Sequence, residues 1–202
     1  MRPKRTLLWI GVVCSGVALA GAGADVQIRD INGQWLSPFK PAGLASVLFF
    51  VSTDCPVSNS YAPEIQRICN EYEPRGVGCS LMYEDVDLDG TPPGSRLTER
   101  VRTHLDEYQY RGVHAAIDSE RTIAHRVKAT VTPQAVVVDR EGNIRYSGRI
   151  NNFYAALGKS RRQVTVNDLR DALDAVLAGR PVSTPKTEAL GCYIVDPKSL
   201  RK

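Results

Sequence analysis

The sequence predicts a single α/β domain in which helices cover a central mixed sheet, and three observations support this prediction. Residues 46–52, "SVLFFVS", form a continuous apolar run typical of a strand buried on both faces. Apolar runs and amphipathic stretches then alternate in the order βαβαβα, which is typical of a layered α/β sheet. After Thr132-Pro133, two strand-like runs joined by a short turn predict an antiparallel hairpin.

The individual elements are predicted from periodicity and from their boundary residues. The first are a short strand, an Asn-Gly turn and a second edge segment in "VQIRDINGQWLSPF". An apolar stripe at helical spacing predicts one helix over residues 56–73, which Pro74 and Gly76 end. The remaining predicted elements are strands at 77–86, 113–118, 134–139 and 143–150, and helices at 97–110, 121–129 and 166–179.

The first 24 residues have the features of a secretory signal peptide. Arg2, Lys4 and Arg5 precede an apolar run over residues 7–20, and a small-residue cleavage site follows. We therefore expect a periplasmic or secreted protein, with a domain at 25–180 and an extended tail at 181–202. The apolar run is shorter than the roughly 20 residues of a bilayer span, so membrane attachment is expected only if the leader is retained.

The charge of the chain argues against a nucleic-acid partner. The whole chain has 26 basic and 22 acidic residues, and loss of the leader leaves 23 basic against 22 acidic, a net charge of +1. Such a balance provides no electrostatic attraction to nucleic acid or to an anionic membrane. Nothing in the sequence indicates the oligomeric state.

Cys55 lies where the buried strand meets the first helix, with Pro56 at the first helical position. Unpaired N–H groups at a helix start favour the thiolate, so Cys55 is a candidate nucleophile; the alternative is a small buried core residue. Ser58 stands where a dithiol motif has its second cysteine. The Cys-Pro-Val-Ser motif can therefore activate sulfur, with the Ser58 hydroxyl as a donor, but cannot release a mixed disulfide alone.

The segments "FFVSTDCPVSNSYAPEI" and "VTPQAVVVDREGNIRYSGRI" resemble the thioredoxin-like fold. They are similar in particular to its redoxin branch, the alkyl hydroperoxide reductase and thiol-specific antioxidant superfamily with exported thioredoxin-like reductases. The resemblance covers about residues 26–177, and it implies that Pro133 is a cis-proline facing Cys55. The similarity to peroxiredoxins implies that Ser52 supplies a hydroxyl and that Arg145 supports the thiolate, although Leu48 replaces the expected proline.

A second sulfur for Cys55 has to come from outside the first helix. Cys69 is 14 residues further along that helix, about 20 Å away, whereas a disulfide needs Cα atoms within about 7 Å. Cys69 and Cys79 are instead candidates for a structural disulfide, the alternative being two buried free thiols. Cys192, in "TEALGCYI", is a candidate to resolve or cap Cys55, the alternative being a thiol that anchors the tail.

The sequence thus predicts a thiol-dependent oxidoreductase in which the Cys55 thiolate attacks a protein disulfide or a peroxide and a thiol donates electrons. No organic cofactor or metal is expected. The acidic loop at 85–90 resembles half of a calcium loop, but Arg96 stands where the bidentate glutamate belongs, so we expect a strand-end loop near Cys55. The alternative function is a non-catalytic binding or scaffold protein that holds its partner in a groove beside Pro133.

Overall fold

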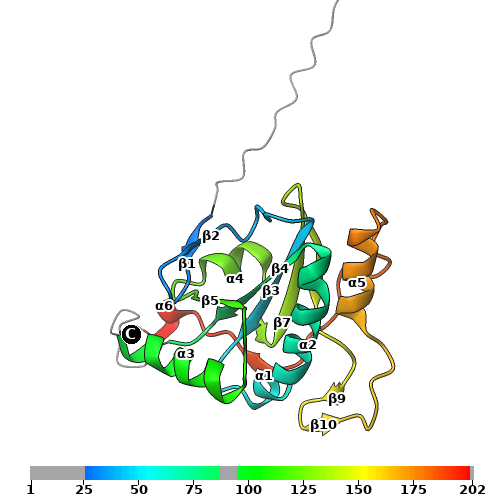
Figure 1. The fold of residues 1–202 in the computed structure, drawn as a ribbon. Coiled ribbons are helices and arrows are strands. Elements are labelled where there is room, and N and C mark those ends of the chain that lie inside the picture. Colours follow the sequence, from blue (N-terminus) through cyan, green and yellow to red (C-terminus); the bar gives the residue numbers. More distant parts are fainter. Residues whose placement is uncertain (1–25, 87–94, 201–202) are drawn as a thin grey trace, which may run out of the picture.

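The computed structural model describes residues 26–86 and 95–200, and its centre is a five-stranded mixed sheet (Figure 1). The strand order is β5-β4-β3-β7-β8, in which β3, β4 and β5 are parallel and β7 is antiparallel to both β3 and β8. The strands are β3 (Ala45–Val51), β4 (Val77–Tyr83), β5 (His114–Ile117), β7 (Gln134–Asp139) and β8 (Ile144–Gly148). The α/β fold class predicted from the sequence is confirmed.

Helices cover both faces of this sheet. Successive side chains of a strand point to opposite faces, and in the central strand both sets are apolar and have to be buried. In β3, Val47 and Phe49 join one apolar cluster, whereas Leu48 and Phe50 join the other, and all four are fully buried. The first cluster is covered by α2 (Ala62–Tyr72), α3 (Ser95–Glu107) and α5 (Asp168–Leu177), the second by α4 (Thr122–Val127). The continuous apolar pattern of this strand follows from burial on both faces.

The helix predicted over residues 56–73 is two helices, α1 (Pro56–Ser60) and α2, with a break at Tyr61. Pro63 falls at the start of α2, where its missing N–H is tolerated, but its ring would clash with the carbonyl four residues earlier in one continuous helix. The prediction of a single helix was therefore wrong at this proline. The break makes α1 a short separate turn that begins directly after Cys55.

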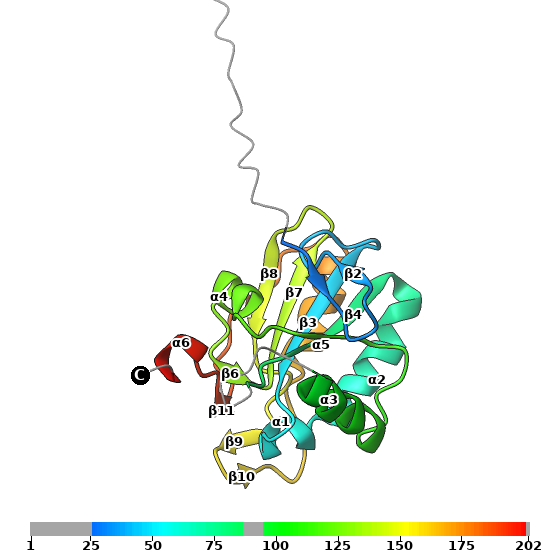
Figure 2. The same cartoon turned by 90° about the vertical axis from the view of Figure 1, so that its left-hand side faces the viewer.

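Short elements make up the rest of the fold and surround the large sheet as small two-stranded pairs and single turns. Of these, β1 (Ile28–Arg29) and β2 (Trp35–Leu36) are the strand and the edge segment predicted on either side of the Asn-Gly turn. The others were not predicted, because two- or three-residue strands carry too little periodicity to be recognised. They are η1 (Glu73–Arg75), β6 (Val131–Thr132), β9 (Tyr154–Ala156), β10 (Lys159–Ser160), β11 (Cys192–Tyr193) and α6 (Pro197–Leu200). The β9–β10 hairpin projects beyond α1 at one end of the molecule (Figures 1 and 2).

The C-terminal segment, residues 181–200, is extended as predicted over most of its length, but it is tied to the domain. Its first part lies against β8, where the Ser147 N–H donates to the carbonyl of Pro185 and the Thr187 N–H donates to the carbonyl of Ser147. Further along, β11 pairs antiparallel with β6, with Cys192 opposite Thr132 (Figure 2). This pairing carries the last cysteine to the end of the sheet where β3 leads into α1.

No helix within residues 26–86 and 95–200 is long and apolar enough to cross a bilayer. The leader at 1–24 lies outside the described residues, and so does most of the acidic loop at 85–90.

Candidate active site

Cys55 and Cys192 are joined by a disulfide, with their Cα atoms 6.0 Å apart. This separation is within the usual range for disulfides, about 4.4–6.8 Å. Cys55 follows the end of β3, and Cys192 is placed opposite it by the pairing of β11 with β6. The structure therefore brings together the two cysteines that sequence analysis paired as candidates.

Cys55 occupies the N-cap position of α1, with an extended backbone (φ −91°, ψ 108°). Its Sγ accepts the backbone N–H of Ser58 at 3.4 Å and lies 3.1 Å from the carbonyl oxygen of Thr132. The cysteine is only 1% exposed. The sequence left open a nucleophile or a small buried core residue at this position, and in the disulfide form with Cys192 the side chain is buried.

The peptide bond between Thr132 and Pro133 is cis, as the resemblance to the thioredoxin-like fold implies. Pro133 lies beside the disulfide, since the carbonyl of the residue before it contacts the Cys55 sulfur. Its ring lines a cavity of about 570 Å³, called here the proline cavity.

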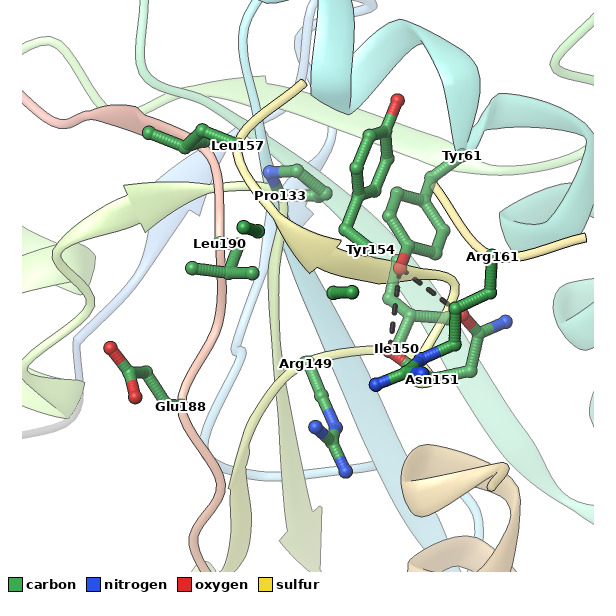
Figure 3. Close-up of a pocket in the computed structure, with 12 residues that line it drawn as sticks. Tyr61, Pro133, Arg149, Ile150, Asn151, Tyr154, Leu157, Arg161, Glu188 and Leu190 are labelled. Carbon is green, nitrogen blue, oxygen red and sulfur yellow. Dashed lines mark hydrogen bonds between the residues drawn. The ribbon is translucent and has the colours of Figure 1, made fainter. Parts of the chain in front are cut away.

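Aromatic, charged and apolar side chains surround the proline cavity (Figure 3). Tyr61 and Tyr154 approach one another with ring centroids 5.9 Å apart, and the Tyr61 hydroxyl donates to Oδ1 of Asn151 at 3.1 Å. Burial raises the pKa of Tyr61 to about 12, so its hydroxyl remains a donor at neutral pH. Glu188 and Leu190 of the C-terminal segment complete the wall.

A second, smaller cavity of about 190 Å³ lies beside Cys192 and is called here the acidic cavity. Cys192 contributes to its wall, whereas Cys55 does not. The other lining residues are Ser52, Asp54, Glu84, Asp85, Val86, Arg100, Thr132, Tyr193, Ile194 and Val195.

Asp85 fixes the loop that precedes Cys55. Its buried carboxylate accepts the backbone N–H of Thr53 at 3.1 Å and the Ser52 hydroxyl at 3.3 Å, and it forms an ion pair with Arg100 at 3.2 Å. Asp85, the first residue of the predicted acidic loop, therefore lies at the site. The hydroxyl of Ser52, however, is bound to Asp85, which differs from the thiolate contact that the resemblance implied.

A buried hydrogen-bond chain holds the same loop from the other side, and sequence analysis missed it. The Tyr83 hydroxyl contacts Nδ1 of His104 at 2.9 Å, and Nε2 of His104 contacts Oδ1 of Asn59 at 2.9 Å. Asn59 in turn donates to the carbonyl of Thr53 at 2.9 Å. Burial lowers the pKa of His104, which favours the neutral ring in this chain. No sequence spacing links these residues, because they come from four different elements and loops.

Ser58 contacts Cys55 through its backbone N–H and is itself 1% exposed. Its hydroxyl is buried and has no hydrogen-bond partner among the described residues in the disulfide form. A buried hydroxyl without a partner costs about 1–3 kcal/mol, so this atom is available for a new acceptor.

Arg145 does not belong to this site. Its guanidinium pairs with Asp139 at 3.3 Å, and Asp139 is opposite Ala45 at the start of β3. The length of β3 separates that point from Val51, and seven residues of strand span about 20 Å. The role of thiolate support that the peroxiredoxin resemblance implied for Arg145 is therefore wrong, because the hairpin turns this arginine toward the opposite end of the sheet.

Cys69 and Cys79 are free thiols in the core, so the candidate structural disulfide is not formed. A hydrogen bond with Cys79, together with burial, strongly raises the pKa of the Cys69 thiol. Disulfide chemistry proceeds through the thiolate, which this environment disfavours. The alternative of two buried free thiols, which the sequence left open, is the one that the structure has.

Arg121, the residue before α4, connects the C-terminal segment to the end of β4. Arg121 lies 3.2 Å from the carboxylate of Glu84, and both side chains are 1% exposed. Arg121 also donates to the carbonyls of Glu84 at 2.8 Å and Val195 at 3.0 Å. Burial raises the pKa of Glu84 well above its usual range. Within the described residues, no group of three or more His, Cys, Asp or Glu side chains is arranged to hold a metal ion.

No protein-family model matches the chain, and no curated protein matches it. Solved structures do. A hypothetical protein from Sinorhizobium meliloti is 28% identical, with a TM-score of 0.69 over 85% of this chain and 90% of that chain. A thioredoxin-like protein from Aeropyrum pernix is 16% identical, with a TM-score of 0.52 over 77% of this chain and 89% of that one. A secreted Mycobacterium tuberculosis disulfide oxidoreductase, homologous to E. coli DsbE, is 15% identical, with a TM-score of 0.50 over 77% and 96%.

The sheet order, the cis-proline and these similarities define the class: the protein has a thioredoxin-like fold. Within that fold it carries a disulfide between the strand–helix junction and the C-terminal segment.

Proposed function

We propose that the protein is an exported thiol–disulfide oxidoreductase in which Cys55 is the nucleophile and Cys192 the resolving cysteine. The observation that carries the proposal is the Cys55–Cys192 disulfide beside the cis Thr132–Pro133 bond. Ser58 leaves the motif with one sulfur, and the C-terminal segment supplies the second one.

The proposed reaction has two exchange steps. The Cys55 thiolate attacks one sulfur of a client disulfide, which forms a mixed disulfide and releases the other client sulfur as a thiolate. The Cys192 thiolate then attacks Cys55, which forms the intramolecular disulfide and releases the second client thiolate. Two electrons pass to the client, and an external dithiol returns the protein to its reduced form.

Access of the client to Cys55 requires the C-terminal segment to lift once the disulfide is reduced. Without the disulfide, residues 192–195 are held by the two-residue β11–β6 pair, by one further backbone bond from Ile194 to Thr130, and by the Arg121 contact with Val195. Short pairings of this kind belong to the low-stability end of local opening.

A disulfide is favoured over a peroxide as the substrate. Arg145, which the peroxiredoxin resemblance implied as support for the thiolate, is at the far end of β3, and the Ser52 hydroxyl is bound to Asp85. The cis-proline beside the cysteine is the one that the resemblance to the thioredoxin-like fold implies. A peroxide would instead oxidise Cys55 to the sulfenic acid, which Cys192 would condense with, releasing water.

Ser58 is proposed to tune the thiolate. In the disulfide form its hydroxyl is buried without a partner, while its N–H already faces the sulfur. After reduction, a Cys55 thiolate nearby would provide the acceptor that this hydroxyl lacks. The hydroxyl would then favour the reduced form over the oxidised one.

Export is supported by the leader pattern at residues 1–24, and the secreted oxidoreductase from Mycobacterium tuberculosis has the same fold. An oxidising compartment also suits a protein whose active-site cysteines form a disulfide. We propose the periplasm or the exterior as the location, with a membrane role only if the leader remains attached.

A second candidate function, that of a non-catalytic binding protein, is favoured by the proline cavity. Its volume of about 570 Å³ is within the range of ligand sites, roughly 300–1,000 Å³, and its wall combines aromatic with charged side chains. In that case the Cys55–Cys192 disulfide would merely anchor the C-terminal segment.

Turnover of a protein disulfide decides between the two functions. The mature protein is supplied with a dithiol reductant and insulin, the reduction of the insulin interchain disulfides is followed, and peroxide consumption is measured in parallel. We expect disulfide reduction that Cys55→Ser abolishes and that Cys79→Ser, at a buried cysteine outside the site, preserves. Equal rates for wild type and Cys55→Ser would support the binding protein.

A further inference from the structure

The disulfide offers an incoming thiol two sulfurs, and their surroundings differ. Cys55 is 1% exposed, enclosed by the carbonyl of Thr132 at 3.1 Å and the N–H of Ser58 at 3.4 Å. Cys192 is half-buried and forms part of the wall of the acidic cavity. A thiol that approaches the oxidised protein through this cavity therefore meets Cys192.

We infer that the electron donor attacks Cys192, so that client and donor use different sulfurs of the same disulfide. This inference rests on the proposed function, because it assumes that the Cys55–Cys192 disulfide is turned over. It adds a second chemical role to Cys192, which then resolves the client complex in one half of the cycle and receives the donor thiol in the other.

The surroundings of the two sulfurs also decide which one leaves more easily. In thiol–disulfide exchange the sulfur that is not attacked departs as a thiolate, and a better stabilised thiolate departs faster. A departing Cys55 keeps the N–H of Ser58 and gains the unpaired Ser58 hydroxyl as a second donor. A departing Cys192 would form its charge in a cavity lined by the two aspartates Asp54 and Asp85, which share the single cation of Arg100. Access and leaving-group stability therefore point to the same direction of attack.

The chemistry balances with a dithiol donor. Its first thiolate bonds to the Cys192 sulfur, the bond between Cys192 and Cys55 breaks, and the electron pair stays on Cys55. The second donor thiolate attacks the donor sulfur of this mixed disulfide, which releases Cys192 as a thiolate that takes up a proton. The donor becomes a disulfide and the protein regains both thiols.

The exposed side chains next to Cys192 indicate where a protein donor makes contact. Tyr193 is 82% exposed and Val195 is 43% exposed, and both line the acidic cavity. Large apolar side chains at such exposure are available to pack against the surface around a donor thiol.

Reduced glutathione is a suitable probe, because a monothiol has no second thiol to release Cys192 intramolecularly, so the mixed disulfide can be trapped by alkylation. The oxidised full-length protein is mixed with glutathione, quenched with excess N-ethylmaleimide at a series of short times, and mapped by peptide mass spectrometry. Extrapolation to zero time removes later migration of glutathione between the two sulfurs. Cys79→Ser serves as the control, since it removes a buried thiol that is not part of the disulfide.

We expect glutathione on Cys192 and maleimide on Cys55, with an excess of about tenfold or more over the opposite arrangement, because both access and leaving group favour it. Glutathione on Cys55 with maleimide on Cys192 would overturn this inference and leave the proposed function standing. A disulfide that no thiol concentration opens would overturn both.

Discussion

Cys55 and Cys192 are 137 positions apart in the sequence, yet their Cα atoms lie 6.0 Å apart and their sulfurs are bonded. The pairing of Cys192 with Thr132 in β11 and β6 produces this proximity, because Thr132 precedes the cis-proline and contacts the Cys55 sulfur. The C-terminal segment thus supplies the sulfur that the Cys-Pro-Val-Ser motif lacks.

Replacing Cys192 should separate the two halves of the proposed reaction. In Cys192→Ser, the Cys55 thiolate still attacks a client, but only an external thiol can release it, so the mixed disulfide accumulates. We expect steady-state disulfide reduction to fall by about a hundredfold or more, since an intramolecular thiol has a large effective concentration. Non-reducing gels and mass spectrometry of the trapped complex provide the measurement. Wild-type turnover in this variant would exclude Cys192 as the resolving cysteine.

Replacing Ser58 should change the redox equilibrium in a defined direction. Ser58→Ala removes a buried hydroxyl that has no partner in the oxidised protein and that is proposed to donate to the thiolate in the reduced one. The oxidised form gains and the reduced form loses stability, so the reduction potential should fall by about 20–40 mV if the difference is 1–2 kcal/mol.

A glutathione redox titration measures this shift. Ser60→Ala, on the exposed side of the same helix, is the matched control and should leave the potential unchanged. A higher potential in Ser58→Ala would contradict the proposed hydrogen bond.

Asp85 should stabilise the loop that carries Cys55 far more than the neighbouring Asp54 does. Asp85→Ala leaves the Thr53 N–H and the Ser52 hydroxyl without their acceptor and breaks the pair with Arg100. We expect a loss of about 2–3 kcal/mol in the free energy of unfolding, measured with denaturant. Asp54→Ala should cost less than about 0.5 kcal/mol, because its side chain is 79% exposed and its contact with Arg100 is 4.0 Å long. Equal losses would show that the Asp85 contacts do not hold the loop.

Gly191 should be required for placing Cys192. A Cβ at this position would overlap the carbonyl oxygen of Thr132, whereas a Cβ at Gly78 would meet nothing within 4 Å. Gly191→Ala is therefore expected to disturb the β11–β6 pair, weaken the disulfide relative to the dithiol by about 1–3 kcal/mol, and raise the reduction potential accordingly. Gly78→Ala is the control for the same substitution elsewhere. An unchanged potential in Gly191→Ala would mean that β11 tolerates a different register.

The stability of the protein should depend on pH through His104. Burial lowers the pKa of His104 in the folded chain, so a proton binds more tightly to the unfolded chain. The free energy of unfolding is then at its full value above about pH 6.5 and falls as the pH drops below that value. We expect denaturant titrations between about pH 5 and pH 8 to show this fall in the free energy of unfolding in the wild type and a smaller fall in His104→Gln. This range brackets the ordinary histidine pKa of about 6.5. The control variant His125→Gln, which changes an exposed histidine, should retain the wild-type slope. The same slope in all three proteins would assign the pH dependence to other groups.

The sheet was predictable because its strands are buried on both faces, and β3 accordingly has a continuous apolar run. The cis-proline was implied by the resemblance of the Thr132-Pro133 segment to the thioredoxin-like fold. Cys192 was a candidate partner of Cys55 because it lies on an extended tail, but the sequence left its role as a tail anchor open. The break at Tyr61 was signalled by Pro63 and was overlooked.

Other features could not be predicted, because they depend on three-dimensional placement. The resemblance to peroxiredoxins implied that Arg145 lies near the Cys55 thiolate. In the structure the β7–β8 hairpin places this arginine at the opposite end of the sheet. The chain from Tyr83 through His104 to Asn59 joins residues with no regular spacing. The burial of Arg121 could not be predicted from the sequence, because charged side chains are usually exposed. In the structure its side chain is fully buried and donates to the carbonyl of Val195 in the C-terminal segment.

The most direct test is a redox titration of the mature protein, residues 25–202, with the thiols counted at each potential by alkylation and peptide mapping. If Cys55 and Cys192 form a working redox pair, they become alkylated together in one two-electron transition. The midpoint potential of this transition should lie above about −300 mV, whereas structural disulfides typically have midpoint potentials below that value. Cys69 and Cys79 stay reduced throughout. A Cys55–Cys192 bond that opens only below that potential, or two cysteines that titrate separately, would contradict the proposal.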